Sequence, residues 1–477
     1  MDRIKGIFSA KKPEVADPRE YEPLTEEPHL LEGSTDGEGE IFESDVPFSW
    51  IEYSIFAVIG VAMLWAWNMF LAAAPYFHRR LAADDWIAEN FQSAILSVST
   101  ITNLVAMLIL TNIQYTANYP WRINTALWLN TGAFVLLTIS TRFFLDVSPG
   151  GYLFFLLLMV ACSAWAAGLL QNGAFAFAAS FGRPEYTQAI MAGQGIAGVL
   201  PPIAQMISVL VVPEHGPPNA PPPDNGQGAS QPPPAAHAPG TAAFIYFLTA
   251  VAISAGALAA FVPLVRRHDH IIENRMAEQM SSSVHSVQEA EQARRHVVGL
   301  PTLFRKLHWL AAAVFACFVV AMFFPVFTTK ILSVRPPESH PPRIFLPSAF
   351  IPLAFFFWNL GDLAGRCSAL VPALAAAGRL HPAALFAAGV ARAGFLPLYL
   401  LCNVRGRGAA VASDAFYLLV VQFPFGLTNG WLASSSMMAA GEWVDEGERE
   451  AAGGFMGLCL VAGLAAGSLL SFTAAGI

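Results

Sequence analysis

Charged side chains are scarce in this sequence of 477 residues, because Asp, Glu, Lys and Arg together make up 13% of it. Soluble globular domains carry about 25% charged residues. Apolar residues make up 55% of the chain, and its mean hydropathy is +0.50. The apolar residues also occur in blocks of roughly 20 or more, the length that crosses a bilayer as a helix. The composition therefore excludes an ordinary soluble protein and predicts an all-α polytopic membrane protein embedded in the lipid bilayer.

The sequence also lacks the signatures of several catalytic classes. It has no Gly-x-x-x-x-Gly-Lys-Ser/Thr loop, which argues against an ATP-driven pump. It has neither His-Glu-x-x-His nor Gly-x-Ser-x-Gly, which argues against an intramembrane hydrolase. Its five cysteines show no spacing typical of disulfides or metal ligands, and the net charge of −8 is too mild to indicate nucleic acid binding. We therefore expect no enzymatic activity, metal, cofactor or nucleic acid partner.

A cleavable signal peptide is missing too, and the first apolar span is expected to direct insertion. Residues 1–49 are polar and rich in Glu, Asp and Pro, which predicts a disordered cytosolic tail. Within this tail the run EEPHLL resembles an acidic dileucine sorting signal, in which sorting adaptors would read Glu26, Leu30 and Leu31. The run favours a vacuolar or lysosomal membrane over the plasma membrane, although so short a match also arises by chance.

Hydropathy predicts eleven transmembrane helices, at residues 50–74, 93–112, 123–145, 151–178, 187–212, 242–265, 308–331, 347–371, 380–402, 411–439 and 451–474. A Pro-rich segment, residues 213–240, follows the fifth span and is expected to form an extended outer or lumenal loop. A basic segment, residues 266–307, follows the sixth. It divides the chain into a six-helix bundle, residues 50–265, and a five-helix bundle, residues 308–477, which suggests two bundles around a central cavity.

The basic residues indicate how the chain is oriented in the membrane. Cytosolic loops carry an excess of Lys and Arg. A cytosolic N-terminus places the long basic segment, residues 266–307, and most of the Lys and Arg residues on the cytosolic side. Because the number of predicted spans is odd, the C-terminus is then expected in the lumen of an organelle or outside the cell.

The eighth predicted span carries two opposite charges inside an otherwise apolar segment. In its run WNLGDLAGR, helical spacing puts Asp362 and Arg366 on one face, with Asn359 beside them. Ionised groups within a membrane are costly unless they pair or line a water-filled cavity. We interpret these three residues as the polar wall of a substrate pathway. The alternative is a structural ion pair that only locks two helices together.

Polar or helix-breaking residues also occur in four other spans. Asn68 in the first span is flanked by tryptophans, and it either faces a cavity or belongs to an interfacial aromatic anchor. Gln171 in the fourth can offer a donor and an acceptor to the edge of a heterocycle, or form an interhelical hydrogen bond. The fifth has a small-residue face suited to helix packing, with Gln194 as a weaker cavity candidate. In the seventh, Pro325 after Phe324 is expected to kink the helix at a gate hinge.

Four motifs, in this order along the chain, resemble those of the equilibrative nucleoside transporter family (solute carrier 29). The similarity covers residues from about 50 to 474. The Ala-rich spans and the acidic dileucine tail are most similar to the fungal vacuolar branch of the family. The motifs are WNMF followed by PYF in the first span, YT followed by MAGQGIAG in the fifth, Asn359-x-x-Asp362-x-x-Gly365-Arg366 in the eighth, and NGWL in the tenth.

This resemblance implies a fold like that of the major facilitator superfamily, with the substrate bound between the six-span and five-span halves. It implies nucleosides as cargo, with nucleobases as a further candidate. Asp362 and Arg366 would hold the ribose hydroxyls, with Asn359 supporting them. Trp67 and Leu71 would flank the ligand.

The resemblance also implies roles for residues outside the charged pair. Asn68 would complete the ligand site in the first span, and Gln171 would bind the edge of the base. Phe324 and Pro325 would form a gate that meets the first span around Leu71. Two further residues, Arg122 and Glu450, would make charged contacts on the cytosolic side.

We therefore predict facilitative nucleoside transport by alternating access, carried out by a monomer. Pairing with Arg366 is expected to keep Asp362 ionised, which favours facilitated diffusion over proton-coupled nucleoside symport, the first alternative. A second alternative is a solute carrier of the same architecture for another small polar solute. A third, from a different class, is a membrane receptor or scaffold that transports nothing.

Overall fold

The computed structural model describes residues 48–113, 118–211, 238–282, 299–335, 342–374, 381–471 and 473. The described residues belong to one compact unit. The predicted sorting motif at Glu26, Leu30 and Leu31 lies outside the described residues, as do nearly all of the predicted tail and of the Pro-rich loop. Helices make up the described part almost entirely, and its one β-bridge joins Ile331 to Val404.

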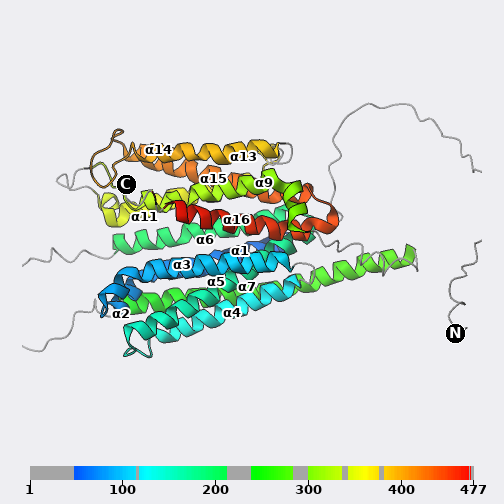
Figure 1. Ribbon diagram of the computed structural model, residues 1–477, viewed down its shortest axis with the longest axis horizontal. Helices are drawn as coiled ribbons and strands as arrows, with labels where there is room; N and C mark the ends of the chain where they lie inside the picture. The colour runs from blue at the N-terminus through cyan, green and yellow to red at the C-terminus, as the bar shows by residue number, and fades with distance from the viewer. Residues whose placement is uncertain are drawn as a thin grey trace, which may run out of the picture. The chain divides into compact units, whose positions relative to one another are not determined.

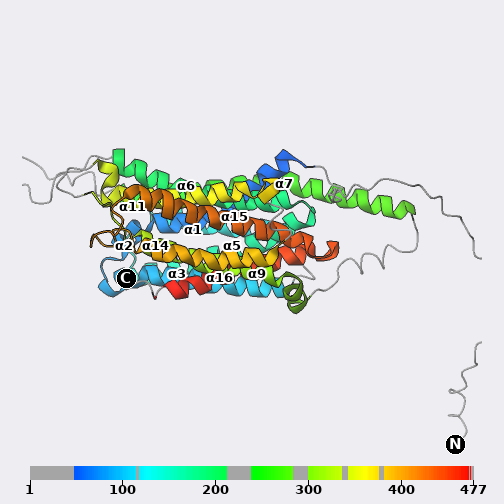
Figure 2. The same ribbon diagram turned by 90° about the horizontal axis from the view of Figure 1, so that it is seen from above.

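Two groups of helices follow one another along the chain (Figure 1). The first helix group comprises α1 (Trp50–Ala72), α2 (Ala74–Leu81), α3 (Asp85–Asn112), α4 (Tyr119–Ser140), α5 (Pro149–Ser180), α6 (Pro184–Val211) and α7 (Ala238–Ser282). The second comprises α9 (Leu300–Ala321), α10 (Phe323–Thr328), α11 (Pro347–Ser368), α13 (Pro382–Ala391), α14 (Phe395–Tyr399), α15 (Phe423–Ala439) and α16 (Arg449–Ser471). In both views the long helices run side by side (Figure 2).

Polar side chains fix where several helices begin. The Asp84 side chain accepts a hydrogen bond from the Ile87 amide at 3.1 Å and so caps α3. Asn118 caps α4 and Ser148 caps α5 in the same way. These residue types satisfy amide groups that the first turn of a helix leaves unpaired. Proline stands in the first turn of α4, α5, α9, α11 and α13, where its missing donor has no cost.

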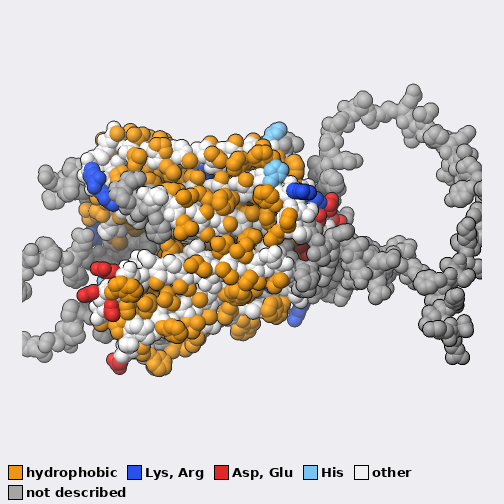
Figure 3. Space-filling model, in the orientation of Figure 1, with side chains coloured by type: hydrophobic (Ala, Val, Ile, Leu, Met, Phe, Trp, Pro, Cys, Tyr) orange, Lys and Arg blue, Asp and Glu red, His pale blue; other side chains and the backbone are white. Residues whose placement is uncertain are grey.

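Among the described residues, nine helical segments are long and apolar enough to cross a bilayer. They correspond to nine of the eleven predicted spans. The two other predicted spans contain α11, which carries the charged pair, and α15, which has 17 residues. Apolar side chains cover the flank of the molecule between charged groups at its two ends (Figure 3). The protein is therefore a multi-pass integral membrane protein, while the count of eleven spans stays a prediction.

Three elements differ from the hydropathy prediction. The helix of the sixth span, α7, does not end near residue 265 but continues to Ser282, into the predicted basic loop. Periodic polar sequence can extend a helix beyond the bilayer, which hydropathy alone does not detect. The ninth span contains α13 and α14, joined by a short 3₁₀-helix at Arg392–Gly394. The tenth opens with a π-helical segment, Phe416–Gln422, before α15.

The seventh span is interrupted where proline was expected to break it. The helix α9 ends at Ala321, and α10 begins at Phe323. Pro325 has no amide hydrogen to donate to the carbonyl of Ala321, four residues earlier. The expected break therefore has its physical cause in Pro325.

One hydrophobic core cluster joins the two helix groups. It contains Phe56 and Phe175 of the first group together with Leu307 and Met437 of the second. It lies at the end where α1, α4, α6 and α9 begin, which is the end predicted to face the cytosol. At this end the two groups share a continuous apolar core.

Two further core clusters belong to one helix group each. The first of them contains Phe70, Phe134 and Phe247 and lies entirely within the first group. The other contains Phe324 and Trp358 and lies entirely within the second. The apolar cores are therefore joined at one end of the bundle and separate towards the other end.

Candidate functional site

The two opposite charges of the eighth predicted span form an ion pair on α11. Arg366 Nε donates to Asp362 Oδ2 at 2.7 Å, and each residue is 4% exposed. The separation of four residues places the two side chains one turn apart on the same helix face. The spacing argument from sequence is confirmed for this contact.

Neighbouring helices complete the hydrogen bonds of this pair. Asn429 Nδ2 of α15 donates to Asp362 Oδ1 at 2.7 Å. On the other side, Arg366 Nη1 donates to the Met191 carbonyl oxygen at 2.9 Å and to Gln194 Oε1 at 3.1 Å, both on α6. The pair thus connects α15 of its own helix group with α6 of the other group.

Glycines let α15 come close enough for Asn429 to reach the carboxylate. A Cβ added at Gly430 would lie 1.8 Å from the Asp362 carbonyl oxygen, and one at Gly426 would lie 2.0 Å from the Trp358 carbonyl oxygen. Such distances mean that the two backbones are in direct contact, which only a residue without a side chain permits. The glycines of α11 and α15 therefore set the position of the polar cluster.

In the conformation described here, the pair is enclosed between α6, α11 and α15, with both side chains 5% exposed. These contacts are the ones expected if the ion pair only holds helices together, which was the alternative to a substrate pathway. The Nη2 donor of Arg366 remains available to a ligand. It bonds to no described residue, and it is not among the enclosed polar atoms that lack a partner. The partners also come from both helix groups, so the same contacts change if the groups move apart.

Asn68 and Asn359 approach the same short stretch of α6, at Ala197 and Gly198. Asn68 Nδ2 of α1 donates to the Ala197 carbonyl oxygen at 2.8 Å. Asn359 Nδ2 donates to the Phe355 carbonyl oxygen at 2.8 Å, and a Cβ added at Gly198 would lie 2.5 Å from Asn359 Oδ1. The small residues of α6 therefore serve close helix contact, as predicted.

Gln171 of α5 is buried, but no described residue pairs with its amide. Its side chain is 6% exposed, it forms no hydrogen bond within the described part of the chain, and its amide atoms are not among the enclosed, partnerless ones. The adjacent Asn172, by contrast, binds Arg122. The interhelical hydrogen bond considered for Gln171 is therefore absent from the described residues.

The residues expected to flank the ligand and to form the gate are not brought together here. Trp67 is half-buried, and Leu71 is 56% exposed. Phe324 instead stacks on Trp358 of its own helix group, with ring centroids 4.2 Å apart and planes 9° apart. Pro325 lies beside it in α10.

The two residues expected to make cytosolic-side charged contacts lie on α4 and α16. Arg122 is 4% exposed and donates to the carbonyl oxygens of Leu110 at 3.2 Å and Ile113 at 3.1 Å, besides Asn172. Its bonds therefore stay within the first helix group. Glu450 is half-buried in the first turn of α16.

A second buried arginine, Arg392, lies near the pair and was given no role by the sequence. It is 3% exposed, and its Nη1 donates to the Cys317 carbonyl oxygen at 2.7 Å. Cys317 Sγ in turn lies 3.3 Å from Asn429 Oδ1. The chain Arg392–Cys317–Asn429 therefore ends at Asp362. An arginine in an apolar span was the available signal, but its partners are set by tertiary packing.

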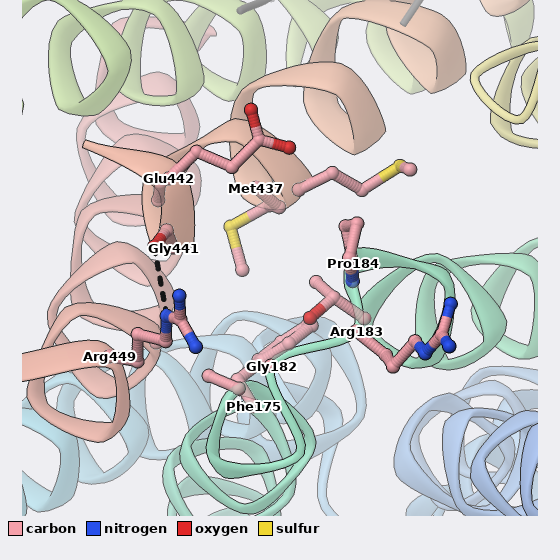
Figure 4. A pocket seen from close by; sticks show the side chains of 13 residues that line it. Phe175, Gly182, Arg183, Pro184, Met437, Gly441, Glu442 and Arg449 are labelled. Atoms are coloured by element: carbon pink, nitrogen blue, oxygen red, sulfur yellow. Dashed lines mark hydrogen bonds between the residues drawn. The ribbon is translucent and has the colours of Figure 1, made fainter. Parts of the chain in front are cut away.

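A pocket of about 50 Å³ lies at the end where the helix groups share their core (Figure 4). Its lining comes from the end of α5, the start of α6 and the region joining α15 to α16. Arg449 Nε reaches the Gly441 carbonyl oxygen at 3.4 Å, while Arg183 points away from it. None of the predicted site residues lines this pocket. The described residues contain no cluster of His, Cys, Asp and Glu that could hold a metal ion.

Known proteins resemble this chain over most of its length. A family profile described as nucleoside transporter matches residues 157–475. The nucleoside transporter FUN26 of Saccharomyces cerevisiae is 27% identical over 459 residues, covering 88% of this chain and 83% of the yeast protein. Equilibrative nucleoside transporter 1 of Mus musculus is 24% identical, covering 88% of this chain and 95% of the mouse protein. Human equilibrative nucleoside transporter 2 is 24% identical, covering 87% of this chain and 95% of its own.

Solved structures show the same fold at low sequence identity. The major facilitator superfamily proton:xylose symporter XylE superposes with a TM-score of 0.53 at 11% identity, covering 89% of this chain and 88% of that one. A bacterial homologue of the iron transporter ferroportin, in an outward-facing state, gives 0.52 at 12% identity, with 90% and 92% covered. The fold is therefore that of the major facilitator superfamily. With the profile match spanning residues 157–475, this chain belongs to the nucleoside transporter family.

Proposed function

We propose that this protein moves nucleosides across its membrane by alternating access, driven by the nucleoside gradient, with Asp362 and Arg366 holding the ribose. The observation that carries this proposal is the buried pair itself. It lies between the two helix groups, and Arg366 bonds directly to α6 of the other group. A group that touches both halves can exchange a protein partner for a ligand hydroxyl when the halves move.

The chemistry of the pair suits a ribose. An ionised carboxylate accepts hydrogen bonds from two hydroxyls, and a guanidinium donates to their oxygens. Charge-assisted hydrogen bonds are roughly twice as strong as neutral ones. Asn429 now donates a hydrogen bond to Asp362, and Gln194 accepts one from Arg366. Ribose hydroxyls can replace both of these protein partners. Substrate binding then replaces contacts between helices without leaving a charge unpaired.

Gln171 is proposed to bind the base. Its amide has both a donor and an acceptor, which matches the polar edge of a nucleobase. Because no described residue uses this amide, a ligand pays no penalty for breaking an existing bond. Trp67, Asn68 and Leu71 on α1 are proposed to cover the ligand, and Asn359 to support the pair.

The arrangement of the apolar cores supports a rocking mechanism. The helix groups share a core at the end predicted to face the cytosol and hold separate cores towards the opposite end. Alternating access requires the shared core to part as the other end closes. In that closing step Phe324 and Pro325 would meet α1 near Leu71. Arg122 and Glu450, at the shared end, would belong to the cytosolic-side contacts.

The direct test is uptake of labelled uridine or adenosine by proteoliposomes that contain the purified protein. We expect saturable uptake that is inhibited by unlabelled nucleosides and is not inhibited by an excess of a hexose. Inhibition by the hexose would favour a carrier for another polar solute. No flux, and no stabilisation by any nucleoside, would favour a receptor or scaffold. Uptake that follows an imposed pH gradient, with both faces titrated, would favour proton-coupled symport.

The vacuolar or lysosomal membrane is the proposed location, with the N-terminus in the cytosol, the C-terminus in the lumen, and a monomer as the working unit. The support is the acidic dileucine run at Glu26, Leu30 and Leu31, which sorting adaptors would bind. A fluorescent fusion of the full chain should label the vacuole. Replacing Leu30 and Leu31 by alanine should move it to the cell surface, and an unchanged location would contradict the proposed signal.

A further inference from the structure

Arg392 is a buried cation whose direct partners, within the described part of the chain, are all neutral. It stands in the 3₁₀-helix between α13 and α14 and is 3% exposed. Its Nη1 and Nη2 donate to the carbonyl oxygens of Cys317 at 2.7 Å and Phe425 at 3.3 Å, and its Nε donates to Thr428 Oγ1 at 3.3 Å. The Arg392 guanidinium carbon also lies 4.9 Å from the centroid of the Phe425 ring. A buried charge is costly unless it is hydrogen-bonded and balanced by an opposite charge, and these contacts supply only the hydrogen bonds.

The balancing charge is Asp362, which Arg392 reaches through two side chains. Besides its bond to the Cys317 carbonyl oxygen, Arg392 Nη1 lies 3.1 Å from Cys317 Sγ on α9. Cys317 Sγ lies 3.3 Å from Asn429 Oδ1 on α15, and Asn429 Nδ2 donates to Asp362 Oδ1 at 2.7 Å. The charges of Arg392 and Asp362 also attract each other. These four residues form a polar relay that joins a buried arginine to the carboxylate proposed to hold the ribose.

The two ends of the polar relay set the direction of every hydrogen bond in it. An arginine side chain can only donate, and an ionised carboxylate can only accept. Since the Cys317 thiol accepts from Arg392, its own hydrogen is free to be donated to Asn429 Oδ1. With Oδ1 used in this way, the Nδ2 donors of the amide are left for Asp362. The reversed amide would place Oδ1 against the carboxylate, so that two acceptors would face each other.

The charge of Arg392 therefore orients a group that the proposed mechanism uses. Hydrogen bonds in series polarise one another in a low-dielectric interior, and an ionised partner strengthens each bond that it joins. In that mechanism a ribose hydroxyl replaces Asn429 as the donor to Asp362. The freed Nδ2 can donate to the oxygen of this hydroxyl as long as the relay keeps it turned towards Asp362. A neutral side chain at position 392 could fill the space but could not fix this direction.

We propose that Arg392 is a positioning residue for ribose binding. Acting through Cys317, it keeps Nδ2 of Asn429 turned towards Asp362, so that an arriving hydroxyl finds an acceptor and a donor side by side. The ligand class is a riboside that carries a 2′- or 3′-hydroxyl, and Arg392 itself does not touch it. This inference rests on nucleoside transport as the proposed function. It extends the ribose site to α9 and to the 3₁₀-helix after α13.

The test begins at Cys317, because its thiol can be removed while both charged residues stay in place. Cys317→Ala keeps the backbone carbonyl that Arg392 binds but breaks the polar relay. In proteoliposomes it should raise KM for uridine about fivefold, as expected for one neutral hydrogen bond, while kcat changes little. KM for 2′,3′-dideoxyuridine, which lacks both hydroxyls, should not change. Cys317→Ser, whose hydroxyl also accepts and donates, should restore most of the lost affinity for uridine.

Cys402→Ala is the matched control for the loss of a buried thiol. Cys402 belongs to the same helix group and is 4% exposed, and its Sγ donates to the Leu398 carbonyl oxygen at 3.5 Å and not to a member of the polar relay. Cys402→Ala should lower Tm about as much as Cys317→Ala, because each leaves a cavity of one sulfur atom. It should leave KM for uridine and for 2′,3′-dideoxyuridine as in wild type.

Arg392→Met tests whether the guanidinium acts through the thiol. KM for uridine should rise and KM for 2′,3′-dideoxyuridine should not, a difference that a merely structural role would not produce. Arg392→Lys, which keeps a cation, should recover part of the loss. In the Cys317→Ala background, Arg392→Met should add little to KM, because the polar relay is already broken there. Should Arg392→Met fail to fold, the two Cys317 variants decide the proposal alone.

The outcomes separate this inference from the function beneath it. An unchanged KM for uridine in Cys317→Ala would overturn the positioning role. An equal rise in KM for uridine and 2′,3′-dideoxyuridine would assign the polar relay to packing and also overturn it. Fully additive effects of Arg392→Met and Cys317→Ala on KM would show that Arg392 acts by another route, with the same consequence. Absence of nucleoside flux in wild-type protein would overturn the proposed function and this inference together.

Discussion

Arg366 reaches out of its own helix group and donates from Nη1 to the Met191 carbonyl oxygen at 2.9 Å. The same guanidinium holds Asp362 through Nε at 2.7 Å. One side chain therefore bonds within α11 and across the boundary between the two helix groups. Any motion that parts α6 from α11 must break the first bond, while the second can persist. A ribose hydroxyl that replaces the α6 partner would link binding to that motion.

Replacing Asp362 by Asn should lower kcat/KM for uridine uptake at least tenfold, because the hydrogen bonds of a charged acceptor are worth about 1.5–3 kcal/mol each. The effect should be smaller for a 2′-deoxynucleoside, which already lacks one hydroxyl. Uptake by proteoliposomes gives kcat/KM for uridine and for the 2′-deoxynucleoside. Asp85→Asn, at an exposed position in the first turn of α3, is the control and should behave as wild type. Equal losses for both substrates would argue against a contact with the ribose hydroxyls.

Replacing Gln171 by Leu should leave Tm unchanged and still weaken nucleoside uptake. No hydrogen bond within the described residues involves this amide, so its removal breaks none of them. The neighbouring Asn172→Leu should lower Tm, since Arg122 then loses a buried partner. Thermal unfolding of the two purified variants, Gln171→Leu and Asn172→Leu, tests this difference in Tm. A fall in Tm for Gln171→Leu as large as that for Asn172→Leu would mean that Gln171 has a structural role.

Replacing Gly430 by Ala should disrupt the contact between α11 and α15. The added Cβ would lie 1.8 Å from the Asp362 carbonyl oxygen, so the helices must move apart and Asn429 must withdraw from Asp362. We expect the free energy of unfolding to fall by several kcal/mol, as for overpacked cores, so that little folded protein is recovered. Gly132→Ala is the control, since nothing lies within 4 Å of its added Cβ. Comparable yield and Tm for the two variants would refute the close backbone contact.

Replacing Pro325 by Ala should restore the amide that can bond to Ala321 and so make α9 and α10 one continuous helix. If the break is the hinge of a gate, the maximal uptake rate should fall while KM changes little, since no proposed ligand contact is lost. Phe324→Leu, which leaves the proline in place, separates loss of the Trp358 stack from loss of the hinge. An unchanged maximal rate for Pro325→Ala would remove the hinge from the mechanism.

The sequence predicts those parts of the fold that depend on one segment alone. Helix positions follow from apolar blocks, and the contact between Asp362 and Arg366 follows from a spacing of four residues on one helix. The partners of the pair could not be predicted in this way. Met191 and Gln194 lie on a helix more than 170 residues earlier, and Asn429 lies 67 residues after Asp362.

Other features could not be predicted from the sequence for the same physical reason, because they depend on contacts between distant segments. The bonds of Arg392 to Cys317 depend on how α9 packs against the α13 region. The extension of α7 to Ser282 was missed because hydropathy detects apolar segments and not polar helix. Side chains whose role depends on a distant helix are therefore found only in the folded chain.

The most direct measurement of the central claim is thermal unfolding of the purified protein with a panel of ligands. The panel contains uridine, its 2′- and 3′-deoxy forms and free uracil, each added to wild-type protein and to Asp362→Asn. A ligand that binds the folded state raises Tm in proportion to its affinity. We expect uridine to raise Tm of wild type, each deoxy form to raise it less, and Asp362→Asn to respond weakly to all. Equal stabilisation by uridine and its deoxy forms, unchanged in Asp362→Asn, would contradict the claim that this buried pair holds the ribose.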